Sequence, residues 1–187
     1  EIPTLIITDI DTIKPETTDK GIRYISCPVK CNETSGTSNA SIKYFLDIPK
    51  YDEDKAKKDV EYKKQYEAGY KTWFEEVLLH KKECVSPIIY VTYQMEENGY
   101  YARSFEDAFI NMNFENLKNN LESIRGLKNI KEFEDEDSVN NRYNFTQSVI
   151  EKKSDFASSI LFLAYTKEIN WSAPSYIQEG IKWLQKQ

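Results

Sequence analysis

Short continuous apolar runs alternate along the chain with longer stretches in which apolar residues recur every three or four positions. Residues 5–7 form one such run, Leu-Ile-Ile, and residues 88–93 form another, which follows Pro87 and is rich in β-branched and aromatic residues. Runs of this kind predict strands, and the first is typical of a strand covered on both faces in an α/β sheet. A further short strand is expected within residues 22–29.

The stretches with three- and four-residue spacing predict helices. The longest runs from Asp52 to about Lys82 and carries a stripe of tyrosines and other aromatic residues. Such a stripe is more often a packing face than a platform for stacked bases, because base-stacking platforms usually lie among basic residues on a sheet or loop. We therefore expect a helical insertion, at about residues 51–84, that leans on the core.

Capping residues mark where other helices begin. Either Ser38 or Asn39 is expected to cap a helix that passes through Leu46, and Ser104 is expected to cap a helix that opens at Phe105. The remaining expected helices span residues 114–124 and 147–165, with a last helix whose first turn contains Pro174; the acidic residues 132–137 are expected to form a solvated loop.

The composition predicts a folded chain that does not bind nucleic acid through positive charge alone. The 187 residues are 40% apolar and 13% aromatic, which argues against disorder and suits one domain spanning residues 1–187. The formal net charge of −6 is unusual for a nucleic-acid-binding module. Any contact with nucleic acid is therefore expected to use metal ions, or a basic surface elsewhere in a larger protein.

Neither end of the chain carries a membrane or export signal that we can identify. No stretch approaches the roughly 18 consecutive apolar residues of a membrane helix, and no signal-peptide pattern opens the sequence. A cytoplasmic protein without membrane contact is expected. Residues 1–3, Glu-Ile-Pro, lead directly into the first strand, and this predicts that the chain is an N-terminally truncated part of a longer protein.

Polar chemistry begins where the first apolar run ends. Asp9 and Asp11 follow that run, and side chains two residues apart on an extended chain point to the same side. In α/β sheets, ligands gather at the carboxyl ends of the strands. We therefore expect two convergent carboxylates, a natural site for Mg²⁺ or Mn²⁺, which prefer oxygen ligands. An aspartate pair that caps a turn is the alternative.

Other kinds of catalytic chemistry have few residues to draw on. Cys27, Cys31 and Cys84 lack the paired spacing of a zinc site, and His80 is the only histidine. His80 stands at the end of a helical pattern, where a helix-end position explains it most simply. Serine or cysteine catalysis through a histidine base is therefore not favoured.

Two charged residues near helix starts are open to two interpretations each. Glu106 lies in the first turn of the helix capped by Ser104, where a carboxylate complements the helix dipole but can equally serve as a metal ligand. Lys153 lies near the start of the helix expected over residues 147–165, where a lysine is ordinarily only solvated. Neither residue alone decides the function.

Together and in this order, these segments resemble the Toprim nuclease domain of the OLD (overcoming lysogenization defect) family, ATP-dependent endonucleases in which an ABC-type ATPase precedes the Toprim domain. The resemblance spans nearly the whole chain. The matching stretches are residues 7–11 (Ile-Thr-Asp-Ile-Asp), 37–39 (Thr-Ser-Asn), 101–109 (Tyr-Ala-Arg-Ser-Phe-Glu-Asp-Ala-Phe), 153–157 (Lys-Ser-Asp-Phe-Ala), 174–181 (Pro-Ser-Tyr-Ile-Gln-Glu-Gly-Ile) and 183–184 (Trp-Leu).

The resemblance implies a Toprim-like α/β fold, with a mainly parallel sheet flanked by helices and a helical C-terminal portion. By position it makes Asp9 and Asp11 ligands of one Mg²⁺ or Mn²⁺ ion and assigns Ser104 and Glu106 to a second ion. It also makes Lys153 the active-site lysine. The implied activity is endonucleolytic cleavage of DNA, in which two ions about 3.5–4 Å apart hold the attacking and leaving oxygens.

The resemblance also has implications for a longer protein. OLD-family proteins are bacterial, are often linked to defence against phage, and are generally homodimers through a portion that precedes the Toprim domain. ATP would act only through the upstream ATPase, which this chain lacks. Toprim domains also carry a glutamate after an earlier strand, and nothing before Leu5 can supply it. We therefore expect the C-terminal part of such an enzyme, with most of the nuclease ligands.

Two other functions start from the same aspartates. Haloacid-dehalogenase-type phosphatases place a nucleophilic aspartate in Asp-x-Asp-x-Thr/Val at a strand end, but here the fifth position is Ile13. Such a phosphatase would hydrolyse a generic aryl phosphate and trap a covalent aspartyl phosphate, whereas a Toprim nuclease should do neither. A non-catalytic interaction module of a larger assembly is the second alternative.

Overall fold

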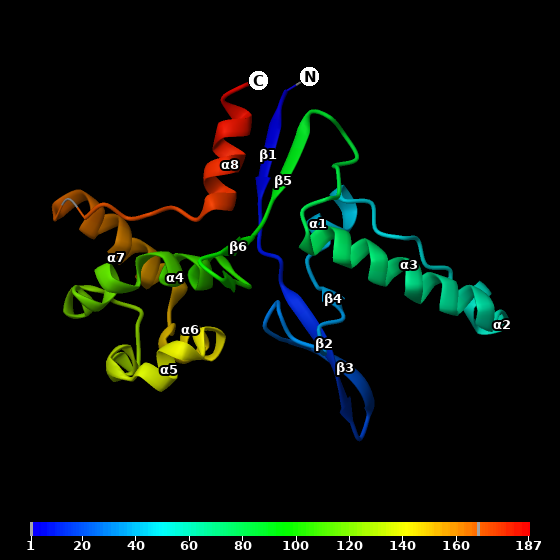
Figure 1. The fold of residues 1–187 in the computed structure, drawn as a ribbon, viewed down its shortest axis with the longest axis horizontal. Helices are drawn as coiled ribbons and strands as arrows, with labels where there is room; N and C mark the ends of the chain where they lie inside the picture. The colour runs from blue at the N-terminus through cyan, green and yellow to red at the C-terminus, as the bar shows by residue number, and fades with distance from the viewer. Residues whose placement is uncertain (1, 168) are drawn as a thin grey trace.

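The computed structural model describes residues 2–167 and 169–187, and it has the mixed α/β architecture expected from the sequence (Figure 1). Strand β1 (Thr4–Ile7) pairs in parallel with β5 (Ile89–Thr92), in the register that sets Ile7 opposite Thr92. Helix α8 (Ser175–Leu184) packs along both strands. The molecule is therefore built on a small parallel sheet flanked by helices.

Strand β1 is less buried than its apolar sequence predicts. Ile6 packs on a hydrophobic core, and Leu5, on the opposite face, approaches α8. Ile7 shares the face of Leu5 but is 45% exposed. The expectation of a strand covered on both faces was therefore wrong, because α8 covers only part of the second face.

A three-stranded antiparallel sheet follows, in the order β3-β2-β4. It consists of β2 (Thr12–Thr18), β3 (Gly21–Ser26) and β4 (Gly36–Thr37). Strand β3 confirms the strand expected within residues 22–29, but β2 was not expected. The β2–β3 hairpin projects from the body of the molecule and is largely exposed (Figure 1), so its sequence carries no apolar alternation that would reveal a strand.

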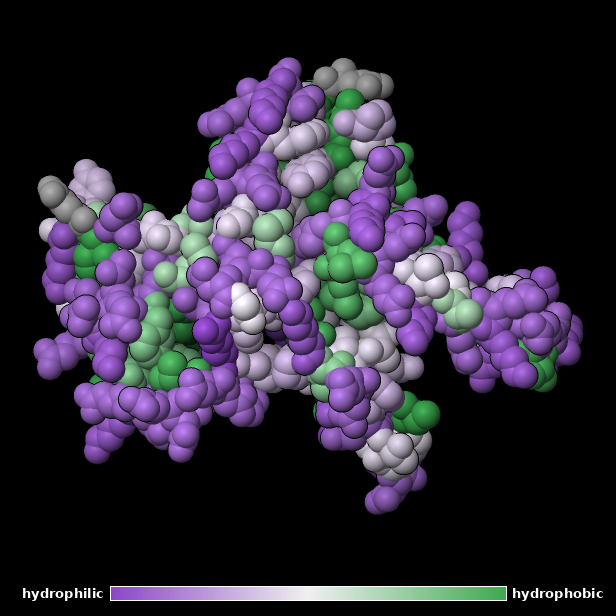
Figure 2. All heavy atoms as spheres, viewed as in Figure 1, coloured by the Kyte–Doolittle hydropathy of each residue, from purple (hydrophilic) through white to green (hydrophobic). Residues whose placement is uncertain are grey.

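The single helix expected over residues 52–82 is instead two helices, α2 (Glu53–Lys58) and α3 (Val60–Leu78). Asp59, between them, has an extended backbone, and its side chain caps α3 by accepting a hydrogen bond from the Tyr62 N–H. Figure 1 shows α2 and the start of α3 projecting as an arm, and Figure 2 shows that hydrophilic side chains cover most of its tip.

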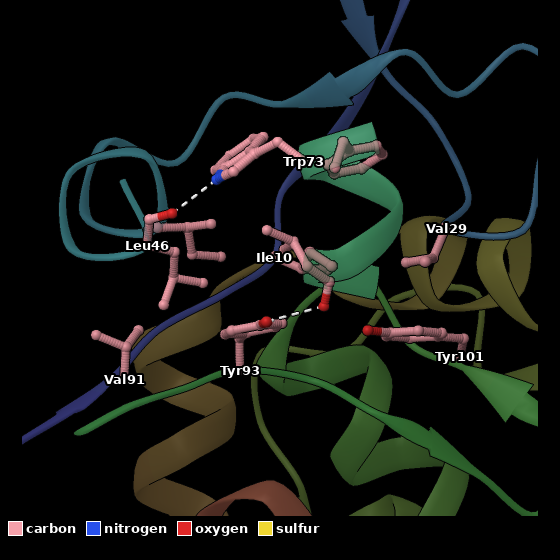
Figure 3. Packing of buried hydrophobic residues seen from close by; sticks show 10 residues of the cluster. Ile10, Val29, Leu46, Trp73, Val91, Tyr93 and Tyr101 are labelled. Carbon is pink, nitrogen blue, oxygen red and sulfur yellow. Dashed lines mark hydrogen bonds between the residues drawn. The ribbon is translucent and has the colours of Figure 1, made fainter. Parts of the chain in front are cut away.

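The other end of α3 packs into the first of two main hydrophobic cores. Trp73, Phe74 and Val77 are buried there, and the Trp73 indole N–H donates to the Leu46 carbonyl at 2.7 Å (Figure 3). Leu46 follows helix α1 (Ala40–Phe45). The packing role expected for the aromatic stripe is thus confirmed at the C-terminal end of α3.

Helix α4 merges what the sequence predicted as two helices. The elements of this region are β6 (Glu96–Glu97), β7 (Tyr100–Tyr101), α4 (Phe105–Lys118) and the short 3-10 helix η1 (Leu121–Ser123). The separate helix expected over residues 114–124 is present in part: the backbone of Asn113 is non-helical, a helical segment follows it over residues 114–118, and η1 covers three of the remaining residues. At Asn113 the helix is kinked, and the Asn113 Nδ2 donates to the Phe109 carbonyl one turn earlier at 2.9 Å.

A second hydrophobic core lies among α4 and the helices that follow it. These are η2 (Ile130–Glu134), α5 (Glu136–Asn140), α6 (Arg142–Val149) and α7 (Lys153–Thr166). Residues 134–137 are exposed, as expected of an acidic run, but residues 132–137 are largely helical and not a loop, and Phe133 within them is 1% exposed and anchors η2. The helix expected over residues 147–165 is interrupted, because the Gly126 carbonyl accepts hydrogen bonds from the N–H groups of Glu151 and Lys152.

The carboxyl ends of β1 and β5 lie between the two cores. In Figure 1 the helices α4 to α7 lie on one side of this junction, and α1 and α3 lie on the other. Within residues 2–167 and 169–187, no helix is long and apolar enough to cross a membrane. The junction is where the polar residues singled out in the sequence come together.

Candidate active site

Asp9 is held at the end of β1 by two hydrogen bonds to the same carboxylate oxygen. Its Oδ1 accepts from the Phe105 backbone N–H at 2.8 Å and from the Gln94 side-chain amide at 2.6 Å. The first contact joins residues 96 positions apart in the sequence. No donor among the described residues forms a hydrogen bond with the Asp9 Oδ2. One oxygen of Asp9 is therefore available to a ligand.

Gln94 is a site residue to which the sequence analysis gave no role. It is fully buried, and its Oε1 accepts from the Ile10 N–H at 2.7 Å while its Nε2 reaches Asp9 and the Tyr176 hydroxyl. Since Ile7 lies opposite Thr92, Gln94 stands two residues beyond β5 as Asp9 stands two residues beyond β1. The sequence could have indicated a role for Gln94 only through this shared position, two residues after the end of a parallel strand.

Asp11 lies beside Asp9 for a different reason from the one expected. The backbone of Asp11 is left-handed, with φ +48°, so an extended chain from Asp9 to Asp11 was wrong. Between the two aspartates Ile10 is fully buried in the first core (Figure 3), which anchors both residues at its edge. The Asp11 Oδ1 is 3.1 Å from the Arg103 guanidinium, whose Nε also donates to the Thr12 carbonyl at 3.2 Å.

The hydroxyl-rich loop after β4 holds the backbone of this segment. Asn39 caps α1 as expected, and its Nδ2 donates to the Asp9 carbonyl at 2.8 Å. The hydroxyls of Thr37 and Ser38 donate to the carbonyls of Ile10 and Asp11. The polar side chains of Thr37, Ser38 and Asn39 therefore serve to hold the backbone of residues 9–11 in place.

Glu106 and Lys153 form an ion pair at the edge of the same site. The Lys153 Nζ lies 2.8 Å from the Glu106 Oε2, although the residues are 47 positions apart in the sequence. Glu106 is in the first turn of α4 and Lys153 is the first residue of α7, so the N-terminal ends of two helices meet here. Side-chain exposure is 13% for Glu106 and 64% for Lys153, which leaves the ammonium group accessible.

Ser104 is close by but is used as a helix cap. Its side chain is buried and accepts from the Asp107 N–H at 3.4 Å, which confirms the capping role expected for it. Asp107 faces away from the site into the protein, where it accepts hydrogen bonds from Tyr100, Thr146 and the Arg103 backbone. Burial raises the pKa of Asp107, and these donors oppose that rise.

The pKa of Asp9 responds both to its burial and to the neighbouring carboxylates. Burial raises the pKa of Asp9, and the charges of Asp11 and Glu106 raise it further, while the hydrogen bonds from Gln94 and Phe105 lower it. A carboxylate that is desolvated beside two others gains most from a bound cation. The residue set therefore has the charge that a divalent ion requires.

The donor chemistry fits a hard divalent ion, but a complete set of ligands is not assembled. Within the described residues there is no group of three or more His, Cys, Asp or Glu side chains arranged to hold a metal ion. The physical reason is that Asp11 is turned toward Arg103 and Glu106 toward Lys153. Of Asp9, Asp11 and Glu106, it is Asp9 that is held by neutral donors among the described residues and not by a cation.

His80 contacts the site indirectly, through Gln94 and Tyr93. It follows α3, as its expected helix-end position requires, and it stacks on Tyr93 with ring centroids 4.3 Å apart. Its Nε2 is 3.0 Å from the Gln94 carbonyl, and burial lowers its pKa. His80 therefore packs against the residue that positions Asp9 and does not face the carboxylates as a base.

The comparisons with known proteins agree with a nuclease relationship. Neither a family model nor a solved structure matches the chain. The whole chain aligns with endonuclease GajA of Bacillus cereus (strain HuB5-5), with 30% identity over 203 aligned residues. The chain spans 24% of that protein's length. It is thus related over its full extent to one part of an endonuclease.

Proposed function

We propose that this chain carries the divalent-metal-dependent active site of a DNA endonuclease, of the Toprim type that the sequence resembles. The observation that carries the proposal is that three separate segments of the sequence meet here: the Phe105 N–H, next to Glu106, donates to Asp9, and Lys153 pairs with Glu106, while Asp11 follows Asp9 by two residues. Asp9, Asp11, Glu106 and Lys153 are the residues that the resemblance assigns to phosphodiester cleavage. The relationship to an endonuclease over the whole chain supports the same reaction.

The residues that would hold the ions follow from the donor chemistry. Asp9 and Asp11 would hold one Mg²⁺ or Mn²⁺, and Glu106 with Ser104 would hold a second. Bound there, such ions supply charge neutralisation at the phosphate and favour deprotonation of the attacking water. To accept an ion, Asp11 and Glu106 would have to loosen their pairs with Arg103 and Lys153.

The remaining residues of the site position charge. Gln94 and the Phe105 N–H fix Asp9 through Oδ1, so that Oδ2 faces the ligand in one orientation. The exposed Lys153 ammonium is placed to neutralise negative charge that develops on the phosphate oxygens. Lys152, the residue before α7, makes no capping hydrogen bond with its side chain to the described residues, so first-turn N–H groups of α7 can also face an anion.

The proposal extends to the longer protein to which this chain would belong, and this part of it rests on the family resemblance. We place the chain in the C-terminal part of a longer bacterial protein with an upstream ATPase, dimeric through that upstream portion, with a role in defence against phage. The relative GajA extends far beyond the aligned region, since the chain spans 24% of its length. The ATPase would couple ATP to cutting, and the missing Toprim glutamate would lie upstream.

The test is conversion of supercoiled plasmid to nicked and linear forms in Mn²⁺, with this chain and with the longer protein that contains it. Lys153→Ala should lower cleavage by about 100- to 1,000-fold, the effect typical of removing one group that stabilises the transition state. Lys152→Ala is the matched control, because it removes an exposed lysine one residue away. Both variants should melt close to the native protein, since exposed side chains contribute within about 0.5 kcal/mol.

Each outcome has a distinct meaning. Cutting by the fragment that depends on Lys153 supports the proposal and makes the upstream glutamate dispensable. Lys153-dependent cutting by the longer protein alone supports the proposal and places a required ligand upstream. Equal cutting by Lys153→Ala and the native protein contradicts it. Hydrolysis of an aryl phosphate with a trapped aspartyl phosphate would instead identify a phosphatase, and inactivity of all forms would favour an interaction module.

A further inference from the structure

An apolar pocket of about 240 Å³ lies between α4 and α7, the two helices whose first turns carry Glu106 and Lys153. Every side chain that lines it is apolar. Its walls and floor are formed chiefly by three phenylalanines, one tryptophan and two alanines of α4, α7 and the segment before α8: Phe105, Phe109, Phe156, Trp171, Ala157 and Ala164. No residue of the proposed mechanism uses this pocket with its side chain.

The pocket is continuous with the candidate active site through both helices. Phe105 lines the pocket with its ring while its backbone N–H donates to Asp9, and it precedes Glu106. Ala157 lies four residues after Lys153 in α7, so the two share one face of that helix. A ligand whose phosphate met Lys153 would therefore have its neighbouring group at the mouth of the pocket.

The rings around the pocket are fixed in place and only partly covered. Phe109 and Phe156 are buried and form the floor, whereas Phe105 is 37% exposed. Phe109 packs on Phe105 and on Trp171, with ring centroids 5.7 and 5.6 Å apart. The Trp171 indole N–H donates to the Ile160 carbonyl, which holds that ring too. The pocket thus offers rigid aromatic surface next to exposed charge.

We propose that this pocket receives a nucleobase of the DNA strand, one that flanks the phosphate held at the site; this rests on the proposed function. Bases are flat, with apolar faces that stack on aromatic side chains, and such stacking tolerates any base. Because no polar side chain lines the pocket, it holds the base by stacking and does not read its sequence. Stacking in the pocket would help to hold the DNA strand, because a chain with a net charge of −6 has little electrostatic attraction for DNA.

The neighbouring charges favour a nucleotide over an apolar side chain of a partner protein. A partner packed over the pocket would also cover Lys153 and Glu106, and taking an ion pair out of water is costly. A nucleotide instead brings its own phosphate to Lys153. Leu161, which lines the pocket, is followed along α7 by Phe162 and Tyr165, and all three are exposed. This apolar strip could contact a partner protein, so the experiment below also tests for such a contact.

The experiment measures binding of a fluorescent single-stranded DNA of about 12 nucleotides, a length suited to one binding domain. Ca²⁺ replaces Mg²⁺, and a gel checks that the DNA stays intact. A second oligonucleotide of the same length lacks every base, so that no shift along the strand can supply one to the pocket. Ala157→Leu fills the pocket from an exposed position, and Ala164→Leu fills it from two turns further along α7. Ser158→Leu, exposed and outside the pocket, is the matched control.

We expect removal of the bases to weaken binding to the native chain by at least about 5- to 150-fold, the range seen when one stacking contact is lost. Both pocket-filling variants should bind the intact DNA with a loss in that range and should respond less than the native chain to removal of the bases. Ser158→Leu should behave as the native chain does.

Two results would overturn the proposal without touching the proposed function. One is equal binding of every oligonucleotide by the native chain and the pocket-filling variants, with cleavage still dependent on Lys153. The other is a change of oligomeric mass in Ala157→Leu with DNA binding intact, which would identify the pocket as a protein contact. Absence of both DNA binding and cleavage in the native protein would overturn the pocket and the nuclease together.

Discussion

Asp9 is the residue whose environment says most about the site. It is a carboxylate placed against a buried amide and beside two other carboxylates, and its pKa is raised mainly by burial. The two donors to Oδ1 offset part of that rise but leave the charged form disfavoured. A residue kept in a destabilising environment is typical of a binding or catalytic position, where function and stability oppose each other.

The first prediction concerns Asp9→Asn in EDTA. The unfolded chain releases this proton near the ordinary value of 3.8, and the native chain releases it at higher pH. Native protein therefore binds more protons between those two values, and its stability falls as pH rises through that window. Asparagine keeps an oxygen acceptor for Gln94 and Phe105 but carries no charge, so the variant should melt higher than the native protein at neutral pH.

Melting temperatures measured across pH provide the check. The advantage of Asp9→Asn should be full above the raised native pKa and should disappear below about pH 3.8, where the native carboxyl is also neutral. Asp19→Asn, in an exposed turn away from these contacts, is the matched control for the substitution itself. A variant that melts lower than the native protein at neutral pH would show that the carboxylate is stabilising, contrary to this account.

Sequence alone pointed to the charged residues that the structure brings together, but not to the residues that position them. Asp9 drew notice because it is a carboxylate that closely follows a continuous apolar run. Gln94 and Arg103 were assigned no role, because an amide or a guanidinium has many ordinary uses and their partners lie 85 and 92 positions away. The left-handed backbone of Asp11 has no sequence signal here, since glycine does not mark it.

Among the elements, helix α7 depends on a contact from outside itself. Gly126 has φ +81°, and its carbonyl accepts the N–H groups of Glu151 and Lys152 just before α7 begins. A Cβ on residue 126 would lie 2.4 Å from the Lys152 carbonyl oxygen and 2.6 Å from the Phe156 nitrogen. The position of Lys153, and with it the Glu106–Lys153 pair, is therefore set partly by a glycine 27 residues upstream.

The second prediction compares Gly126→Ala with Gly99→Ala. Both glycines have positive φ, but a Cβ on Gly99 would meet nothing within 4 Å. Gly99→Ala should cost about 1–2 kcal/mol from backbone strain alone. Gly126→Ala should cost about 1–3 kcal/mol more, the usual cost of overpacking, because the start of α7 must move.

Activity should separate the two variants further. A shift of Lys153 by about 1 Å can lower cleavage by about 100-fold, so Gly126→Ala should lose activity well below its melting temperature. Gly99→Ala should cleave as the native protein does once both are compared in the folded state. Urea titrations give the stabilities and plasmid cleavage gives the rates; equal losses in both variants would exclude a role for the Gly126 contact.

Elements with local signals were predictable, and those decided by distant contacts were not. The strand at 88–93 and the caps at Asn39 and Ser104 follow from neighbouring residues, and they are present. The break before α7 depends on Gly126, and the helical turn at Phe133 depends on burial in the second core. Strand β2 is stabilised by pairing with β3 rather than by a buried face, so its polar sequence predicts only a loop.

At the scale of the whole molecule, the site lies where the two cores meet the ends of β1 and β5. Arg103 and Lys153 balance two of its three carboxylates, Asp11 and Glu106, and leave the charge of Asp9 unpaired within the described residues. A bound cation would compete with Arg103 and Lys153 for the same oxygens. Metal binding and the internal ion pairs are therefore coupled, and their coupling can be measured through the stability of the folded chain.

The last prediction follows from that competition. A ligand that binds only the native state stabilises it, by about 2.7 kcal/mol at a concentration 100 times its Kd. Mn²⁺ should raise the melting temperature of the native chain and should raise that of Asp9→Asn much less. Lys153→Ala should bind Mn²⁺ at least as tightly as the native chain, since it frees Glu106 from a cation 2.8 Å away, even though it cleaves DNA far more slowly.

This opposition of sign distinguishes a catalytic lysine from one that merely builds the metal site. If Lys153 held the site together, its removal would weaken Mn²⁺ binding and cleavage in parallel. If it acts on the phosphate, metal-induced stabilisation persists while cleavage falls. Calorimetric titration of Mn²⁺ into the native chain, Lys153→Ala and the Lys152→Ala control decides between them, because an ammonium group beside Glu106 repels a bound cation directly and could favour its binding only by holding the ligands in place.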